Sequence, residues 1–369
     1  MDNSLDSFLR INRLFLSSLG QWPQQEQISK IFTLINAVFF LITQAYFQTG
    51  GMIAAKCDQP IFMESIAPVL ISFMCLVKFV NFNYNADKMR KLLEIIQADW
   101  NSINDLEELK ILNSWAKDSR KNTIMYAGAL YGTMAPFMLG PLVPIFCKLM
   151  PAGVLPANSS IVLEKPVLFH VEYFYDLEKY YYPLLIHSYF GTMAYMTVAV
   201  AIDSMFMVYV QHACAIFAVI GNRLEHLADD SSINFYYNPH ILNDEPYKRM
   251  IECIVQHSKA LQYAQMIQSA NSLSFFFNWD SICSLLLSVD FNWPSQRLAD
   301  ESARISETTT RCAWYLTSMR SRKLLQLFIM RSSVPCQLTA GSFYTLNMQN
   351  FSAVVRTSMS YFTVLTSVQ

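Results

Sequence analysis

The sequence predicts an all-α fold, a polytopic transmembrane helical bundle. Three observations predict it: 53% of the 369 residues are hydrophobic, only 15% are charged, and the mean hydropathy is +0.23. Soluble proteins carry about a quarter charged residues, and apolar stretches of about twenty residues are long enough to cross a bilayer. The net charge of −1 argues against nucleic acid as a partner, because phosphate binding needs a clustered basic surface. Membrane lipid and small molecules are the partners that this composition favours.

Apolar stretches bounded by charged residues divide the single predicted transmembrane domain, residues 1–369, into six spans. The fourth stretch is too long for one crossing, because a helix of its length rises about 58 Å against a hydrocarbon core of about 30 Å. Its inner third is therefore expected to project into the cytoplasm. The six stretches are residues 31–55, 63–82, 123–148, 182–220, 272–291 and 338–368.

The distribution of Lys and Arg predicts a cytoplasmic N-terminus. Seven basic residues lie between residues 87 and 121, whereas the connection between the first two spans holds only Lys56. This orientation places the sequon at Asn158 outside, as a glycosylation site, with a chance triplet as the alternative. With this orientation, seven basic residues between 297 and 331 fall on the predicted outer side, although basic residues of short connections are normally cytoplasmic. A membrane crossing is therefore expected to be missing before them.

No motif in the sequence predicts an enzyme or a cofactor. We find no nucleophile elbow, P-loop, dinucleotide fingerprint or H-E-x-x-H, and the six His and eight Cys residues are not spaced as metal ligands. Cys57 and Cys147 are expected either to form a disulfide with each other or to remain free thiols. Two histidines, His187 and His212, lie on the long fourth stretch. Each is expected either to act in ligand binding or pH sensing, or simply to pack as a polar residue within the bundle.

Three ionisable residues interrupt the apolar stretches. Lys78 lies near the inner end of its span, where a long side chain can reach the interface. Asp203 is expected to be solvated at the cytoplasmic interface. Asp280 is deeper in its span and is the better candidate for a polar cavity.

Three prolines in the third span predict room for a pocket open to the outer side, because proline removes backbone hydrogen bonds and kinks a membrane helix. They are Pro136, Pro141 and Pro144. The alternative is plain helix packing, since Met and aromatic stripes are usually core. The residues expected to bind a small hydrophobic ligand are Met134, Phe137, Phe190, Met193, Met196 and Phe276.

Four segments together resemble one family over nearly the whole chain. Residues 331–347 read RSSVPCQLTAGSFYTLN, and residues 356–365 read RTSMSYFTVL. Residues 176–183 read DLEKYYYP, and residues 209–214 read YVQHAC. The first two look like the last-helix signature of insect odorant receptors, and the other two resemble the hymenopteran branch of that family.

The resemblance implies a seven-helix subunit of a hetero-tetramer, formed with a common co-receptor in the plasma membrane of olfactory neuron dendrites. Such a subunit belongs to a non-selective cation channel that is opened by small volatile or cuticular hydrophobic compounds. By this likeness, residues 294–331 form cytoplasmic anchor helices and residues 342–368 line the pore. Val364 and Val368, four residues apart on one helix face, are expected to form the gate.

The sequence departs from this family at two places. Only the segment 290–295, DFNWPS, stands where the family has its sixth span, and Thr310 stands where the family tends to have Tyr. A missing exon or a degenerate, non-functional receptor would account for the gap. A gustatory receptor channel is the nearest alternative, although residues 360–363, SYFT, favour the odorant branch. A polytopic transporter is the alternative from another class, but its internal repeats are not found.

Overall fold

The described part of the chain is almost entirely α-helical. A computed structural model describes residues 4–143, 167–169, 171–173, 177–227, 244–279, 285–341 and 344–368. Predictions for Asn158, Asp280, Cys147 and Pro144 fall outside the described residues. The chain divides into unit 1, comprising Met1–Arg10, Tyr84–Lys121 and Met205–Gln369, and unit 2, comprising Ile11–Asn83 and Asn122–Ser204, and each unit is described by itself.

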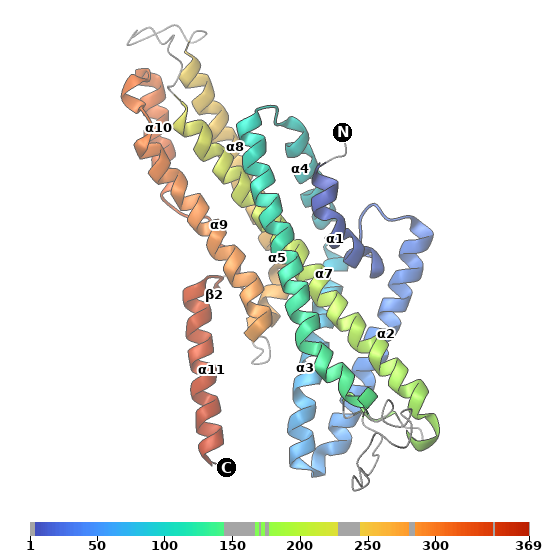
Figure 1. The fold of residues 1–369 in the computed structure, drawn as a ribbon. Coiled ribbons are helices and arrows are strands. Elements are labelled where there is room, and N and C mark those ends of the chain that lie inside the picture. The colour runs from blue at the N-terminus through green and yellow to red at the C-terminus, as the bar shows by residue number, and fades with distance from the viewer. Residues whose placement is uncertain are drawn as a thin grey trace, which may run out of the picture. The chain divides into compact units, whose positions relative to one another are not determined.

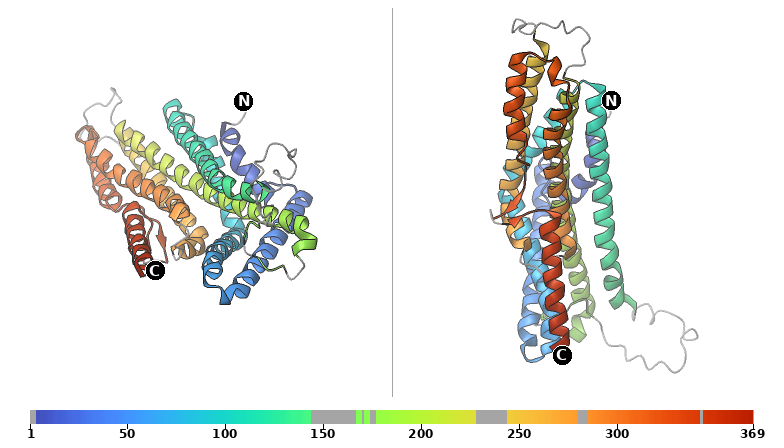
Figure 2. Two further views of the ribbon diagram at one scale, coloured as in Figure 1. Left: turned by 60° about the horizontal axis from the view of Figure 1, so that its bottom comes forward. Right: turned by 90° about the vertical axis from the view of Figure 1, so that its left-hand side faces the viewer.

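Unit 2 contains the two most clearly apolar helices, α2 (Gln27–Ala54) and α3 (Gln59–Tyr84), which the short 3-10 turn η1 (Ala55–Cys57) joins. Figure 2 shows them as neighbouring blue helices, and the Ser72 hydroxyl of α3 donates a hydrogen bond to the Gln48 side chain of α2. One face of α2 exposes large apolar side chains, including Phe32 and Ile35. Such a face suits contact with lipid tails. Both helices are long and apolar enough to span a membrane.

The long fourth apolar stretch forms one helix, α7 (Leu177–Glu225), of 49 residues. Its backbone departs from helical geometry at Tyr180, and Pro183 lies inside it near that point. The segment Lys179–Glu225 is the third stretch of the described residues that could span a membrane by length and composition. The predicted stretch 182–220 thus lies within one helix, which extends beyond the stretch at both ends.

The third predicted span, 123–148, is the later part of a longer helix, α5 (Leu106–Leu139). The apolar pattern marks the start of the span, but the amphipathic residues before it continue the same helix. Pro136 is accommodated inside α5, which ends three residues later and is followed by the 3-10 turn η2 (Gly140–Leu142). The described helix α5 thus ends at Leu139, and residues 144–148 of the predicted span lie outside the described residues.

Unit 1 is built from the short helix α4 (Ala86–Ser102) and three helices that pack together, α8 (Glu245–Trp279), α9 (Leu285–Arg311) and α10 (Met319–Ser332) (Figure 1). The turn η5 (Trp314–Leu316) joins α9 to α10. The helix α1 (Ser4–Ser18) begins in this unit and continues into unit 2.

The chain reverses between α8 and α9. The ring of His257, early in α8, lies 5.0 Å from that of Phe328 in α10, and the ring of Phe275, late in α8, lies 5.5 Å from that of Phe291 in α9. Because α10 follows closely on the end of α9, α9 runs back toward the start of α8.

This reversal corrects two predictions. The stretch 272–291 is not one span: α8 ends at Trp279, and a new helix begins at Leu285. Nor does a polar helix begin at Pro294, which lies inside α9. The basic residues between 297 and 331 return to the end of unit 1 where α8 starts, so the charge pattern needs no further crossing before them.

The last predicted span, 338–368, also begins differently from expectation. A small antiparallel hairpin of β1 (Thr339–Ala340) and β2 (Tyr344–Thr345) comes first, and the helix α11 starts only at Met348 and runs to Val368. Gly341 has φ +60°, a left-handed conformation that glycine adopts readily and that permits the tight reversal. The Asn347 side chain accepts a hydrogen bond from the backbone of Asn350 and so caps α11.

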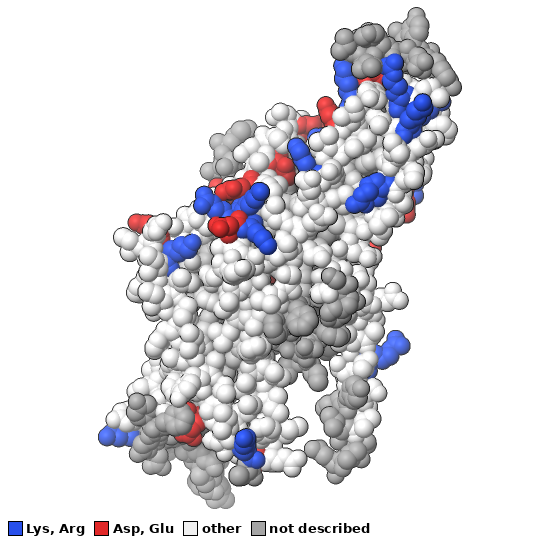
Figure 3. Space-filling model, turned by 180° about the vertical axis from the view of Figure 1, so that it is seen from behind, with Lys and Arg blue, Asp and Glu red and all other residues white. Residues whose placement is uncertain are grey.

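The surface carries few charges, as the composition requires. On the face drawn in Figure 3, Lys, Arg, Asp and Glu form separate patches, and wide areas between the patches carry no charged side chain. Uncharged surface of this extent is expected of a protein whose solvent is largely lipid.

Candidate functional site

The first half of α7, in unit 2, carries a hydrogen-bonded aromatic cluster. His187 lies with Nε2 2.8 Å from the Thr43 hydroxyl and Nδ1 3.4 Å from the Tyr173 hydroxyl. The rings of Phe40 and Phe47, both on α2, lie 5.9 and 5.7 Å from the imidazole ring. Because each ring nitrogen faces a hydroxyl and aromatic rings fill the surroundings, packing within the bundle accounts for His187.

Five of the predicted ligand residues lie on one stretch where α5 and α7 are held together. The Tyr131 and Thr197 hydroxyls are 3.2 Å apart, and the Tyr189 hydroxyl donates to the Met138 carbonyl. On α5, Met134 and Phe137 lie between the two contacts. On α7, the residues between them include Phe190, Met193 and Met196.

Within that stretch the predicted residues have different surroundings. Phe137 is 44% exposed and contacts the ring of Phe169 at 5.2 Å, and Phe190 is 58% exposed and stacks on Phe40 at 5.4 Å. Met193 is exposed, Met134 is half-buried, and Met196 is buried. Phe276 belongs to α8 in unit 1, and its side chain lies outside the description. The structure thus brings together the predicted residues of α5 and α7.

A buried glutamine between α2 and α7 was not found from the sequence. Gln44 is fully buried, and neither atom of its amide has a hydrogen-bond partner. It fills the space beside Gly191, where an added Cβ would stand 2.7 Å from Oε1 and 2.9 Å from the Cβ of Gln44. The Tyr195 hydroxyl, one turn further along α7, donates to the Leu41 carbonyl at 2.6 Å. The only signal in the sequence was a polar residue in an apolar span, four positions before Gln48.

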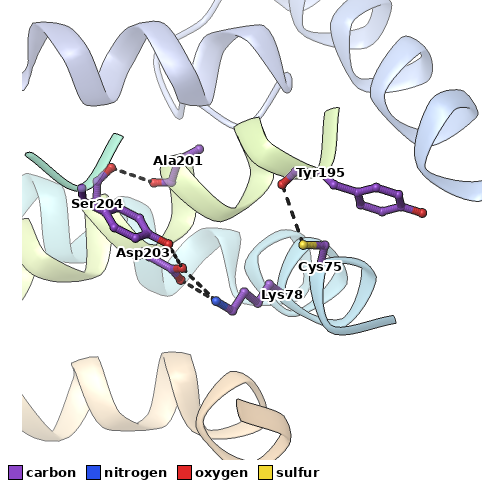
Figure 4. A network of polar contacts seen from close by, with 7 residues as sticks. Cys75, Lys78, Tyr195, Ala201, Asp203 and Ser204 are labelled. Atoms are coloured by element: carbon purple, nitrogen blue, oxygen red, sulfur yellow. Dashed lines mark hydrogen bonds and ion pairs between the residues drawn. The ribbon is translucent and has the colours of Figure 1, made fainter. Parts of the chain in front are cut away.

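A buried ion pair connects three helices of unit 2. Lys78 Nζ lies 2.9 and 2.8 Å from the two carboxylate oxygens of Asp203, and the side chains are 3% and 0% exposed (Figure 4). The Tyr126 hydroxyl donates to the same carboxylate at 2.9 Å. A charge inside a membrane bundle is tolerated when a charged or polar partner replaces water.

This arrangement corrects the predictions for both residues. Lys78 was expected to reach the interface and Asp203 to be solvated there, but each is compensated by the other. Each residue on its own was consistent with an interface position. The signal that could have identified the pair is that two lone opposite charges stood in two different apolar stretches.

A small cavity of about 30 Å³ lies in unit 1, lined by residues from α1, α4, α5 and α7. His212, which is 7% exposed, lines it with its Nε2 3.0 Å from a carboxylate oxygen of Asp99. Gln211 also lines it, and neither atom of its buried amide has a hydrogen-bond partner. The volume suits one or two water molecules, which need polar partners of this kind.

A wider cavity of about 440 Å³ in unit 1 lies beside the end of α7. Arg223 closes part of its wall through two bonds to the Glu108 carboxylate, at 2.5 and 2.6 Å. Both charges are satisfied by this bidentate pair, so they stabilise the joint between α5 and α7.

His257 is a buried histidine in the packing of α7, α8 and α10. Its ring lies 5.8 Å from that of Phe217 and 5.0 Å from that of Phe328, both at steep angles. Burial, assisted by the positive charge of Arg331, lowers the pKa of His257 to about 4. The imidazole is therefore neutral at physiological pH.

The low pKa predicts an acid-sensitive stability. Between pH 6.5, the ordinary His value, and about pH 4, the unfolded chain binds a proton at residue 257 that the folded chain excludes, so stability falls as the pH drops through this window. Above pH 6.5 His257 is neutral in both the folded and the unfolded chain, so it adds no pH dependence to the stability. The variant His257→Phe keeps an aromatic ring but cannot bind this proton. Its melting temperature in detergent should therefore fall less between pH 7.5 and pH 5 than that of the parent, by about 2–4 °C. Equal losses in the parent and the variant would contradict this assignment.

The predicted gate residues lie on α11. Val364 is 56% exposed, and the backbone of Val368 ends the helix, its side chain lying outside the description. Among the residues that the structure describes, no group of three His, Cys, Asp or Glu is placed to hold a metal ion.

Comparisons with known proteins agree on one family. The sequence profile described as 7tm Odorant receptor matches residues 60–289 and 282–359. Odorant receptor 9a of Drosophila melanogaster is 22% identical over 344 residues, which cover 82% of this chain and 81% of that protein. Odorant receptor 13a of the same species is 21% identical over 383 residues, covering 89% and 84%.

A solved structure shares the fold over the whole length. The insect olfactory receptor OR5 from Machilis hrabei, in complex with eugenol, superposes with a TM-score of 0.69 at 14% identity and covers 99% of each chain. The two pieces of the profile match overlap at residues 282–289, and the described helix α9 begins within this overlap at Leu285. Because the profile matches well over half of the chain, the chain belongs to the insect odorant receptor family and has its polytopic helical membrane fold.

Proposed function

We propose that the chain is a ligand-gated, non-selective cation channel subunit that detects small volatile or cuticular hydrophobic compounds. The observation that carries the proposal is the family match over residues 60–289 and 282–359. Its partner is a co-receptor subunit, with which it forms a hetero-tetramer in the dendritic plasma membrane of an olfactory sensory neuron. The reversal between α8 and α9 supports a working subunit, because it keeps residues 297–331 on the side that their charge requires.

The proposed ligand site is the stretch where α5 and α7 are joined, with Met134, Phe137, Phe190, Met193 and Met196 as its residues. These side chains offer apolar and polarisable surface, which recognises a ligand by shape and area. The related receptor OR5 was solved with eugenol, a small aromatic compound, which supports a ligand of that size.

Currents recorded from cells that express the chain with a co-receptor would test this function. Ligand-evoked cation current across an odorant panel is expected, whereas a transporter would show saturable substrate uptake instead. Absence of current with every odorant, although the complex reaches the cell surface, would refute the channel function.

Substitutions at the proposed ligand site are expected to change ligand preference. Phe137→Ala or Phe190→Ala removes one aromatic contact, which costs about 1–3 kcal/mol, or about ten- to a hundredfold in affinity. Dose–response curves for several ligands would measure the shift. Ile35→Ala on the exposed face of α2 is the matched control, because it removes a similar apolar area away from the site and should leave the curves unchanged. Unaltered curves for both site variants would refute the site.

The proposed topology has a cytoplasmic N-terminus, with residues 87–121 inside and Asn158 outside. The seven basic residues between 87 and 121 support it, and Asn158 is then available as a glycosylation site. Glycosidase treatment should increase the gel mobility of the parent but not of Asn158→Gln. Labelling of a tag between residues 87 and 121 by an external reagent would contradict this topology.

The proposed gate is formed by Val364 and Val368 on α11. Rings of apolar side chains can close a narrow pore by dewetting. Val364→Ser is expected to raise the current in the absence of ligand, and a closed resting state identical to that of the parent would argue against this role.

A further inference from the structure

The final helix α11 contains one charged residue, Arg356, within 21 residues. The helix is about 30 Å long, the thickness of a hydrocarbon core, and Arg356 lies about 12 Å from its start. Arg356 is exposed and forms no ion pair or hydrogen bond among the residues that the structure describes. A charge at this depth is costly unless it faces water or a polar partner.

The residues around Arg356 show which face of α11 is polar. Four other polar residues fall within about 40° of Arg356 around the helix axis, at 100° per residue. All are exposed, and together with Arg356 they define the polar stripe: Gln349, Ser352, Arg356, Ser360 and Thr363.

The opposite face of α11 is the one that packs against the rest of unit 1. Its half-buried residues lie about 160° to 260° from Arg356 around the axis, and they are Phe351, Val354, Val355 and Ser358. In Figure 1, α10 lies above the β1–β2 hairpin and α11 lies below it. The polar stripe lies opposite the half-buried residues and is therefore turned away from the contacts that α11 makes within unit 1. The proposed gate residues Val364 and Val368 lie about 80° and 120° from Arg356, so the gate and the polar stripe are on adjacent faces of α11.

We infer that the polar stripe borders the water-filled ion path, on the face of α11 next to the gate residues, and that the Arg356 guanidinium weakens the preference of the pore for cations. The inference rests on the proposed channel function. The serine and threonine hydroxyls can solvate passing ions, whereas a fixed positive charge attracts anions and repels cations. Arg356 is therefore a selectivity-determining residue that this subunit contributes to a mixed assembly, where its effect is combined with that of the co-receptor subunits.

The effect on selectivity can be measured as a reversal potential. Cells expressing the chain with a co-receptor are recorded while the external NaCl is diluted. Arg356→Gln is expected to raise the cation-to-anion permeability ratio about two- to fivefold, since a unit charge about 8 Å from an ion in water is worth a factor of about two for each ion type. Arg356→Glu should raise it further, and Arg356→Lys should leave it unchanged. An identical ratio in the parent, Arg356→Gln and Arg356→Glu would overturn the inference.

The exposure of the polar stripe to water has its own test. Arg356→Cys should react with a water-soluble methanethiosulfonate reagent in membranes, whereas Val354→Cys, on the half-buried face, should not exceed the labelling of the parent. Equal labelling of the two variants would overturn the assignment of the faces. Failure of the channel function would show separately, as absence of ligand-evoked current from the parent, and labelling at position 356 would still decide whether the stripe meets water.

Discussion

Asp203→Asn is expected to destabilise the protein more than any other single conservative change, by about 3–5 kcal/mol. The substitution leaves Lys78 buried, 3% exposed, without its counter-charge. In a thermal melt in detergent the midpoint should fall by about 10 °C. Less of the variant should reach the cell surface, because the ion pair joins α3 to α7 within unit 2.

Two companion variants separate charge from packing at this pair. Lys78→Met combined with Asp203→Asn removes both charges and should recover most of the loss, since a buried ion pair is often replaced by neutral side chains at little cost. Tyr126→Phe removes one hydrogen bond to the carboxylate and should cost about 1.5–3 kcal/mol. A single Asp203→Asn variant that melts like the parent would show that the ion pair does not stabilise the bundle.

Gly191→Ala is expected to separate α2 from α7. The new Cβ would lie 2.9 Å from the Cβ of Gln44, which is fixed to the backbone of α2, so the helix itself must move. Overpacking of this kind costs about 1–3 kcal/mol. The melting midpoint should fall, and ligand responses should weaken because Phe190 is the adjacent residue.

Gly132→Ala on α5 is the matched control, because an added Cβ there meets nothing within 4 Å. It should be neutral or stabilise its helix by up to about 1 kcal/mol. Adding Gln44→Ala to Gly191→Ala should restore only part of the loss, since the Cβ of residue 44 remains. If Gly191→Ala and Gly132→Ala behave alike, the close approach of α2 and α7 is not a constraint.

The sequence predicted the fold class, the family and the non-enzymatic receptor role, and the comparisons confirm all three. Hydropathy is a property of single residues summed along the chain, so it identified α2, α3 and the long α7 well. The limits of the helices were less predictable. The β1–β2 hairpin and the start of α5 at Leu106 depend on contacts and amphipathic packing that a hydropathy window does not contain.

The candidate site was predicted only in part, because a single sequence does not show which distant residues contact each other in the folded chain. Lys78 and Asp203 were each recognised as unusual, but only the folded chain shows that they neutralise each other across 125 residues. Gly191 could not be recognised, since its importance lies in the space that Gln44 occupies. The ligand residues of α5 and α7 remain predictions on helices that the structure joins.

The separation of 125 residues between Lys78 and Asp203 also has a consequence in time. At synthesis rates of about 5–20 residues per second, about 6–25 s pass between the appearance of α3 and that of its counter-charge on α7. During this interval the nascent chain holds an uncompensated lysine in an apolar helix, so α3 cannot reach its final position. The later arrival of α7 completes unit 2, and until then the cell's membrane chaperones encounter an unfinished bundle.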